Sequence, residues 1–171
     1  KASQSTLCKA GAAKVLLERL TANLDCGEVC AGAVMGLYKL VEGGVYFVCE
    51  KIVDGGGVRK AAKAVKRHPN NIQIASYTVW MYKELCKAGL AEDVRREEGL
   101  FAAGLVACRF YDNEFARDAG REVEAMLMEG VDVETETGRF YLRERDEGRA
   151  VGGGSMDDGK AMEIMEKYPR Q

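Results

Sequence analysis

Apolar residues recur along the chain at the spacing of one face of a helix. The segment 11–40 holds two such stretches, and the segment 56–85 repeats them at an offset of 45 residues without a gap. A shorter third unit spans 99–126. Spacing of i, i+3, i+4 and i+7 predicts two amphipathic helices per unit. The apolar positions of the first helices are Ala13, Leu16, Leu17 and Leu20, then Val58, Ala61, Ala62 and Val65, then Phe101, Leu105 and Cys108. Those of the second helices are Val29, Ala33, Leu37 and Leu40, then Ile74, Thr78, Tyr82 and Leu85, then Phe115, Ala119, Val123 and Met126.

The segments between the units predict a third helix for each unit. Residues 45–54 and 90–98 are each long enough for two to three helical turns. Glycines at 11, 55–57 and 99 fall where one helix ends and the next begins, because glycine adopts positive φ without strain. Asparagine or aspartate at 70–71 and 112–113 precedes a final helix, as an N-cap should.

The segment 56–85 resembles an armadillo repeat. It has a Gly-Gly opening, an apolar helix, the loop His68-Pro69-Asn70-Asn71 and the helix IQIASYTVWMYKEL. The resemblance covers residues 5 to 129 and rests on period and pattern. It implies an all-α fold, a right-handed α-solenoid of about three armadillo-like repeats, whose last helices line a concave side. A HEAT-like array of helix pairs is the nearest alternative.

The chain divides into three parts. Residues 1–129 form the predicted repeat stack. Residues 130–155 alternate polar and apolar positions and end in glycines, which favours a flexible or extended linker. Residues 156–171 carry Ala161, Ile164, Met165 and Tyr168 at helical spacing, which predicts a short amphipathic docking helix. The linker and helix together are the C-terminal tail.

Composition gives little support to catalysis. The net charge is −2, and no apolar run approaches the length of a membrane span. The lone histidine, His68, and the spacing of six cysteines fit no metal site or nucleophilic pair, so we expect no metal, no cofactor and no enzyme activity. The cysteines lie among small apolar residues, which favours buried thiols and an intracellular, reducing compartment. The cytoplasm is the default, and an organelle stays open.

The last helix of each unit holds the candidate partner groove. In armadillo repeats that bind basic peptides, this helix carries a Trp and, four residues later, an Asn; here only Trp80 conforms. Peptide binding of that kind is therefore not carried over, and Trp80 fits both a partner anchor and a packing role. The candidate groove residues are Met35, Lys39, Tyr77, Trp80, Met81, Glu84, Asp118, Arg121 and Glu122.

A basic stripe offers a second hypothesis. Residues 59–67 carry five positive and no negative charges. The stripe consists of Arg59, Lys60, Lys63, Lys66 and Arg67. A solvated helix face accounts for it more simply, because no aromatic residues are interleaved. We therefore expect a non-catalytic scaffold or adaptor that binds other protein chains, as a subunit or fragment of a larger complex; an RNA-binding helical repeat is the alternative.

Overall fold

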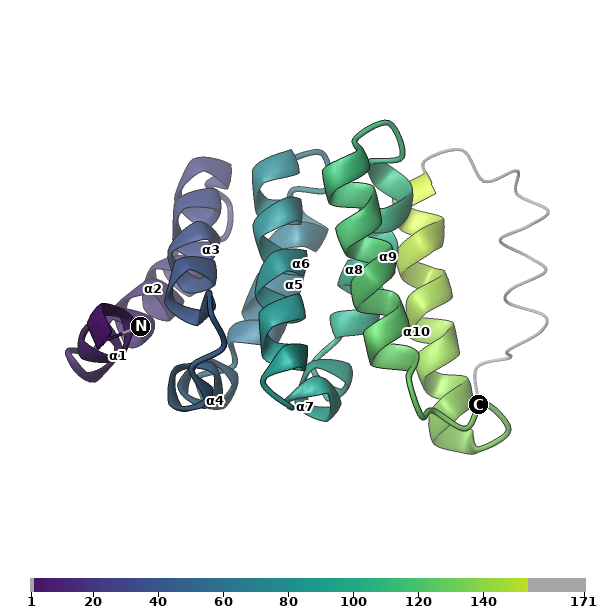
Figure 1. Ribbon diagram of the computed structural model, residues 1–171. Coiled ribbons are helices and arrows are strands. Elements are labelled where there is room, and N and C mark those ends of the chain that lie inside the picture. The colour runs from purple at the N-terminus through teal and green to yellow at the C-terminus, as the bar shows by residue number, and fades with distance from the viewer. Residues whose placement is uncertain (1, 154–171) are drawn as a thin grey trace.

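The protein is all-α over the residues that the structure describes, 2–153 of a computed structural model (Figure 1). This part of the chain contains ten helices and no strand. The helices are α1 (Ala2–Lys9), α2 (Ala12–Ala22), α3 (Gly27–Val41), α4 (Tyr46–Asp54), α5 (Gly57–Arg67), α6 (Ile72–Lys87), α7 (Ala91–Arg96), α8 (Gly99–Arg109), α9 (Glu114–Met128) and α10 (Glu136–Gly153).

The long helices pack in two rows. In one row α3 packs on α6 and α6 on α9, and these helices lie in front in Figure 1. In the second row α2 packs on α5 and α5 on α8. The short helices α4 and α7 lie at the lower edge in that view, between successive long pairs. Helices whose starts are 45 or 42 residues apart in sequence are therefore neighbours in space.

Equivalent residues begin equivalent helices. Gly11 and Gly56 precede α2 and α5 in the left-handed conformation, with φ of 89° and 71°. Glu98 precedes α8 with φ of 68°, although a side chain is disfavoured there. The Asn71 side chain accepts hydrogen bonds from the backbone N–H groups of residues 73 and 74, and Asn113 accepts one from that of residue 116. From Asn71 to Asn113 the offset is 42 residues, shorter than the 45 between the first two units.

The core follows the predicted helical faces closely. Leu20, Leu37 and Leu85 are fully buried, and so is Tyr82, whose hydroxyl donates a 2.7 Å hydrogen bond to the carbonyl of Val58. One predicted core position is wrong. Phe115, in the first turn of α9, has 80% of its surface exposed.

Polar contacts join the loops that precede α3, α6 and α9. The ring Nε2 of His68 lies 2.8 Å from the carbonyl oxygen of Leu24, across two units. Arg67 pairs with Asp25 through the same pair of loops. Farther along, the Arg109 guanidinium donates a 2.7 Å hydrogen bond to the Asn70 side chain. These contacts reinforce the helix packing at the turns that precede α3, α6 and α9. His68 contributes to them through its contact with the carbonyl of Leu24.

The expectation of an extended linker over 130–155 is wrong for most of its length, because α10 runs from Glu136 to Gly153. The Thr135 hydroxyl accepts a 3.0 Å hydrogen bond from the N–H of Gly138 and so caps the first turn. Helix α10 packs along α8 and lies to the right of α9 in Figure 1. Its contact face is made largely of glycine, which a search for apolar side chains passes over. The predicted docking helix, 156–171, lies outside the described residues.

Candidate partner-binding surface

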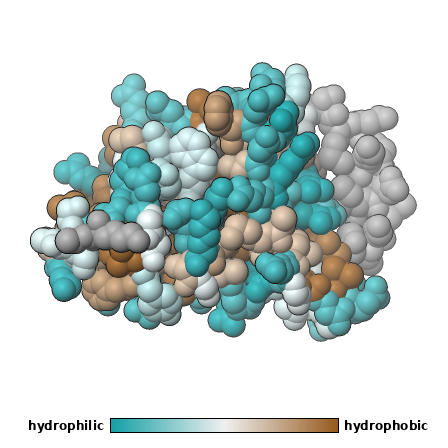
Figure 2. Space-filling model, viewed as in Figure 1, coloured by the Kyte–Doolittle hydropathy of each residue, from teal (hydrophilic) through white to brown (hydrophobic). Residues whose placement is uncertain are grey.

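Three aromatic rings meet where α3 packs on α6. The ring centroids of Tyr38 and Tyr77 are 5.9 Å apart, those of Tyr38 and Trp80 5.7 Å, and those of Tyr77 and Trp80 5.4 Å. All three side chains are half-buried and pack against the core. Figure 2 shows side chains of intermediate hydropathy gathered over α3 and α6 between polar neighbours. This aromatic cluster therefore presents ring surface to solvent while its inner edges support the helix packing.

Charged groups hold Tyr38 in place. Its hydroxyl donates a 3.0 Å hydrogen bond to Oε1 of Glu42, and the Lys39 ammonium lies 2.9 Å from Oε2 of that carboxylate. Lys39 also lies 5.1 Å from the centroid of the Tyr38 ring. Burial, followed by the hydrogen bond to Glu42, raises the pKa of Tyr38 to about 12. The hydrogen bonds from Lys39 and Tyr38 lower the pKa of Glu42. At neutral pH the phenol is thus a donor and the carboxylate an acceptor.

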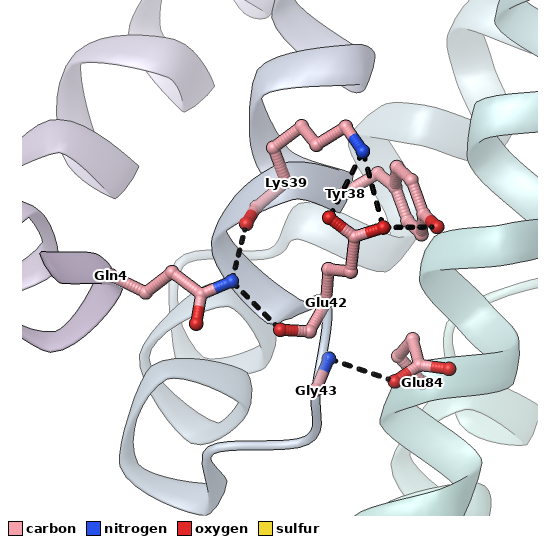
Figure 3. Close-up of polar contacts among 6 residues, drawn as sticks. All are labelled: Gln4, Tyr38, Lys39, Glu42, Gly43 and Glu84. Carbon is pink, nitrogen blue, oxygen red and sulfur yellow. Dashed lines mark hydrogen bonds and ion pairs between the residues drawn. The ribbon is translucent and has the colours of Figure 1, made fainter. Parts of the chain in front are cut away.

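The end of α3 is fixed from two sides (Figure 3). The Gln4 amide donates hydrogen bonds of 2.9 and 2.7 Å to the carbonyls of Lys39 and Glu42. These contacts satisfy carbonyls that the last turn of a helix leaves without partners. Glu84 of α6 accepts a 3.1 Å hydrogen bond from the N–H of Gly43. The aromatic cluster consequently rests on a C-terminus held by both α1 and α6.

Ion pairs continue the surface across α6 and α9. The Lys83 ammonium lies 2.6 Å from Oε2 of Glu122, and Lys87 lies 2.9 Å from Oε1 of Glu84. Both pairs are solvent-accessible, so their contribution to stability is small. They place charges of both signs next to each other on the surface of α6 and α9.

The structure brings most of the predicted groove residues to this face. Tyr77 and Trp80 are two of the three rings of the aromatic cluster, and Lys39 and Glu84 lie close to the third, Tyr38. Glu122 of α9 pairs with Lys83 of α6. Met35 is exposed on α3, one turn before Tyr38.

Three other groove residues lie elsewhere. Met81 is fully buried, so its assignment to an accessible groove is wrong. Asp118 is exposed and pairs with its neighbour Arg117. Arg121 is exposed and its charge acts on Cys108 of α8, lowering the pKa of that thiol against the larger effect of burial. Asp118 and Arg121 thus show no contact with the aromatic cluster.

Tyr38 is the residue that sequence reasoning missed. At the 45-residue offset Trp80 aligns with Met35, and Tyr38 aligns with Lys83, so comparing equivalent positions singles out no aromatic in the first unit. A residue three positions after Met35 lies on the same helix face. An aromatic at that spacing was the available signal.

The basic stripe is largely paired within the chain. Arg59 lies 2.8 Å from Glu97, Lys66 lies 2.9 Å from Glu98, and Arg67 pairs with Asp25. Lys60 donates a 2.8 Å hydrogen bond to the carbonyl of Gly55, and Lys63 is exposed. The stripe therefore presents less free positive charge than its sequence implies.

The buried cysteines are poor candidates for nucleophiles. Burial raises the pKa of Cys49 to about 11 and that of Cys86 to about 12, so both are thiols at neutral pH. Within residues 2–153, no group of three or more His, Cys, Asp or Glu side chains is placed to hold a metal ion. Nor is any helix in this part of the chain long and apolar enough to cross a membrane.

Comparisons with protein-family models, with curated proteins and with solved structures find no match to this chain. The armadillo resemblance therefore stays a prediction from period and pattern. Function has to be argued from the surface itself, and the aromatic cluster is its most distinctive feature.

Proposed function

We propose that the protein is a non-catalytic scaffold that binds other protein chains on the face formed by α3, α6 and α9. In this proposal the helices form a right-handed, armadillo-like α-solenoid of about three units, and the chain acts within a larger complex. The stacking of α3 on α6 and of α6 on α9 supports it. The six unpaired cysteines, most of them buried, support a reducing intracellular compartment.

The half-exposed aromatic cluster is the observation that carries the proposal. Trp and Tyr are enriched among the residues that dominate binding energy, because they offer large rigid surfaces at a small cost in side-chain entropy. Tyr38, Tyr77 and Trp80 come from two helices 45 residues apart in the pattern, so the cluster exists only in the folded stack. Fixed charges beside the rings provide the polar rim that protein interfaces have.

Protein binding ranks above RNA binding for an electrostatic reason. Phosphate recognition needs free positive charge, and Arg59, Lys66 and Arg67 each already contact a carboxylate. The aromatic cluster also lies among paired charges of both signs, which suits a polypeptide better than a polyanion.

Selection from a displayed peptide library tests the proposal. Peptides selected on the wild-type protein are measured against Trp80→Ala and against Tyr111→Ala, which removes an aromatic that is 71% exposed in the loop between α8 and α9 and is not part of the aromatic cluster. We expect Trp80→Ala to weaken binding about 30-fold, equivalent to about 2 kcal/mol, and Tyr111→Ala to leave it unchanged. Circular dichroism confirms that each variant is folded. Equal affinity of the selected peptides for all three proteins would refute the proposed surface.

A further inference from the structure

A cleft of about 440 Å³ lies on another part of the molecule, between α5, the start of α8 and α10. It is lined by two phenyl rings, Phe101 and Phe140, and by five charged side chains. The charged residues are Lys66, Glu98, Arg143, Glu144 and Glu147. Aromatic faces and carboxylates in one cleft are the groups that recognise organic cations.

One cation of the chain itself already uses part of this cleft. The Lys66 ammonium lies 4.2 Å from the centroid of the Phe101 ring and 2.9 Å from Oε2 of Glu98. The second ring, Phe140, has 55% of its surface exposed and contacts no cation among the residues that the structure describes. The cleft therefore has two phenyl rings, and only one of them, Phe101, already has a cation over its face.

The charges leave room for one more cation. Lys66 pairs with Glu98, which leaves one cation, Arg143, beside two carboxyl groups, Glu144 and Glu147. The cleft therefore carries a net negative charge once both carboxyl groups are ionised. Among the described residues Glu144 makes one hydrogen bond, a long one in which its Oε1 accepts from the N–H of Phe101 at 3.4 Å. Phe140, Glu144 and Glu147 follow each other at spacings of four and three residues, so they lie on one face of α10.

We propose that this cleft binds the guanidinium group of an arginine side chain contributed by a partner protein. The planar guanidinium stacks on the Phe140 ring and donates hydrogen bonds to Glu144 and Glu147. Arginine suits the site better than lysine, because its flat, weakly hydrated head group stacks on rings and binds carboxylates in a fork. The cleft lies away from the aromatic cluster and does not depend on it.

Binding in the cleft is coupled to pH through Glu144. Burial, as the largest effect, raises the pKa of this carboxyl to about 7, with Glu98 and Glu147 adding repulsion and Lys66 opposing it. Arg143 of α10 lines the same cleft, and the charge of Glu144 acts in turn on the buried phenol of Tyr82 in α6. A cation requires the ionised carboxylate, so affinity rises as pH increases through 7.

A titration with two tripeptides tests the inference. Acetyl-Gly-Arg-Gly-amide is the probe, and its citrulline counterpart is a neutral molecule of the same shape. Both are added to the ¹⁵N-labelled full chain while amide resonances are followed by NMR. We expect the arginine peptide to shift the amides of Phe101, Glu144 and Glu147 saturably, and the citrulline peptide to leave them unchanged. Affinity should rise about tenfold from pH 6 to pH 8.

Variants separate this site from the aromatic cluster. Glu144→Gln and Phe140→Ala should each weaken the arginine peptide about fivefold or more, and Glu144→Gln should also remove the pH dependence. Trp80→Ala and the exposed-carboxylate control Glu129→Gln should change nothing. Equal binding of both peptides, no saturable shift, or unaltered affinity in Glu144→Gln and Phe140→Ala would overturn the inference. Binding of free butylguanidinium without binding of the arginine peptide would also overturn it, because a partner's side chain could not then enter.

Discussion

Replacing Gly148 with alanine should loosen the attachment of α10. A Cβ atom at Gly148 would lie 2.0 Å from the carbonyl oxygen of Phe101, and one at Gly152 would lie 2.3 Å from that of Leu105. From the opposite helix, a Cβ at Gly104 would lie 2.5 Å from the carbonyl of Arg145. All three obstacles are backbone atoms of the facing helix, which cannot rotate away as a side chain can. The two helices therefore touch backbone to backbone.

The size of the effect follows from two opposing contributions. A Cβ needs about 3.2 Å from a carbonyl oxygen, so α10 has to move outward by roughly 1 Å, and overpacking of this kind costs about 1–3 kcal/mol. Alanine returns about 1 kcal/mol through its higher helix propensity. Because the obstacle is a backbone atom only 2.0 Å away, the cost lies in the upper part of that range, and we expect a net loss of about 1.5 kcal/mol in the free energy of unfolding. For a chain of this length that loss lowers Tm by about 3–6 °C.

Thermal unfolding followed by circular dichroism measures the loss, and Gly153→Ala is the matched control. Gly153 lies in the same helix, yet a Cβ there meets nothing within 4 Å. Hydrogen exchange along residues 136–153 should show faster opening of α10 in Gly148→Ala than in Gly153→Ala. If Gly148→Ala unfolds at or above the temperature of the control, close backbone contact does not hold α10 to α8.

Three further predictions concern buried and exposed positions. In urea unfolding, Glu144→Gln should be about 2 kcal/mol more stable than wild type at pH 8 and equal to it near pH 4.5. The pKa of Glu144 is raised to about 7, so the stability of the wild type falls as pH rises between those two values. Arg149→Ala should lose about 2–3 kcal/mol because the carboxylate of Glu124, 4% exposed, keeps no cation, whereas the exposed control Arg139→Ala should lose little in the same assay. Phe115→Ala should change stability by less than about 0.5 kcal/mol in denaturant titration, against the larger loss that a core phenylalanine would show.

Much of the helical arrangement could be predicted because burial repeats with the pattern. Leu20, Val65 and Leu105 lie at predicted core positions and are buried. The asparagine caps at 71 and 113 also follow from local chemistry that the sequence displays. Phe115 fails because its side chain points to the solvent side of the first turn of α9, whereas the next residue, Ala116, is fully buried there.

Helix α10 could not be predicted by the same rule. Apolar periodicity detects helices that bury side chains, but Gly138, Gly148 and Gly152 bury backbone instead. Glycine also has a low helix propensity. The missing apolar periodicity and the glycine content therefore both favour a linker. The backbone of α8, which is far away in sequence, makes glycine favourable at 148 and 152, and the carbonyl of Asp132 does so at Gly138.

Part of the candidate surface could be predicted; Met81 fails because it faces the core, and Arg121 fails because of register. Trp80 corresponds to Met35 at an offset of 45 residues, but the shorter third unit places Glu122 in the equivalent position at 42. Arg121 was assigned by an offset of 41, and a shift of one residue turns a side chain by about 100° around a helix. The structure accordingly pairs Glu122 with Lys83.

The arginine cleft depends on the docking of α10 at the start of α8. The backbone carbonyl of Phe101 is in close contact with Gly148 of α10, and the ring of Phe101 lines the arginine cleft. The cleft therefore exists only while α10 stays docked, because Phe140 and Glu144 belong to α10. A bound arginine would add contacts between the two helices, and by linkage it would stabilise their association. Gly148→Ala should then weaken the arginine peptide as well as lower Tm, whereas Gly153→Ala should do neither; a Gly148→Ala protein that is destabilised yet binds the peptide with wild-type affinity would separate the cleft from α10 docking.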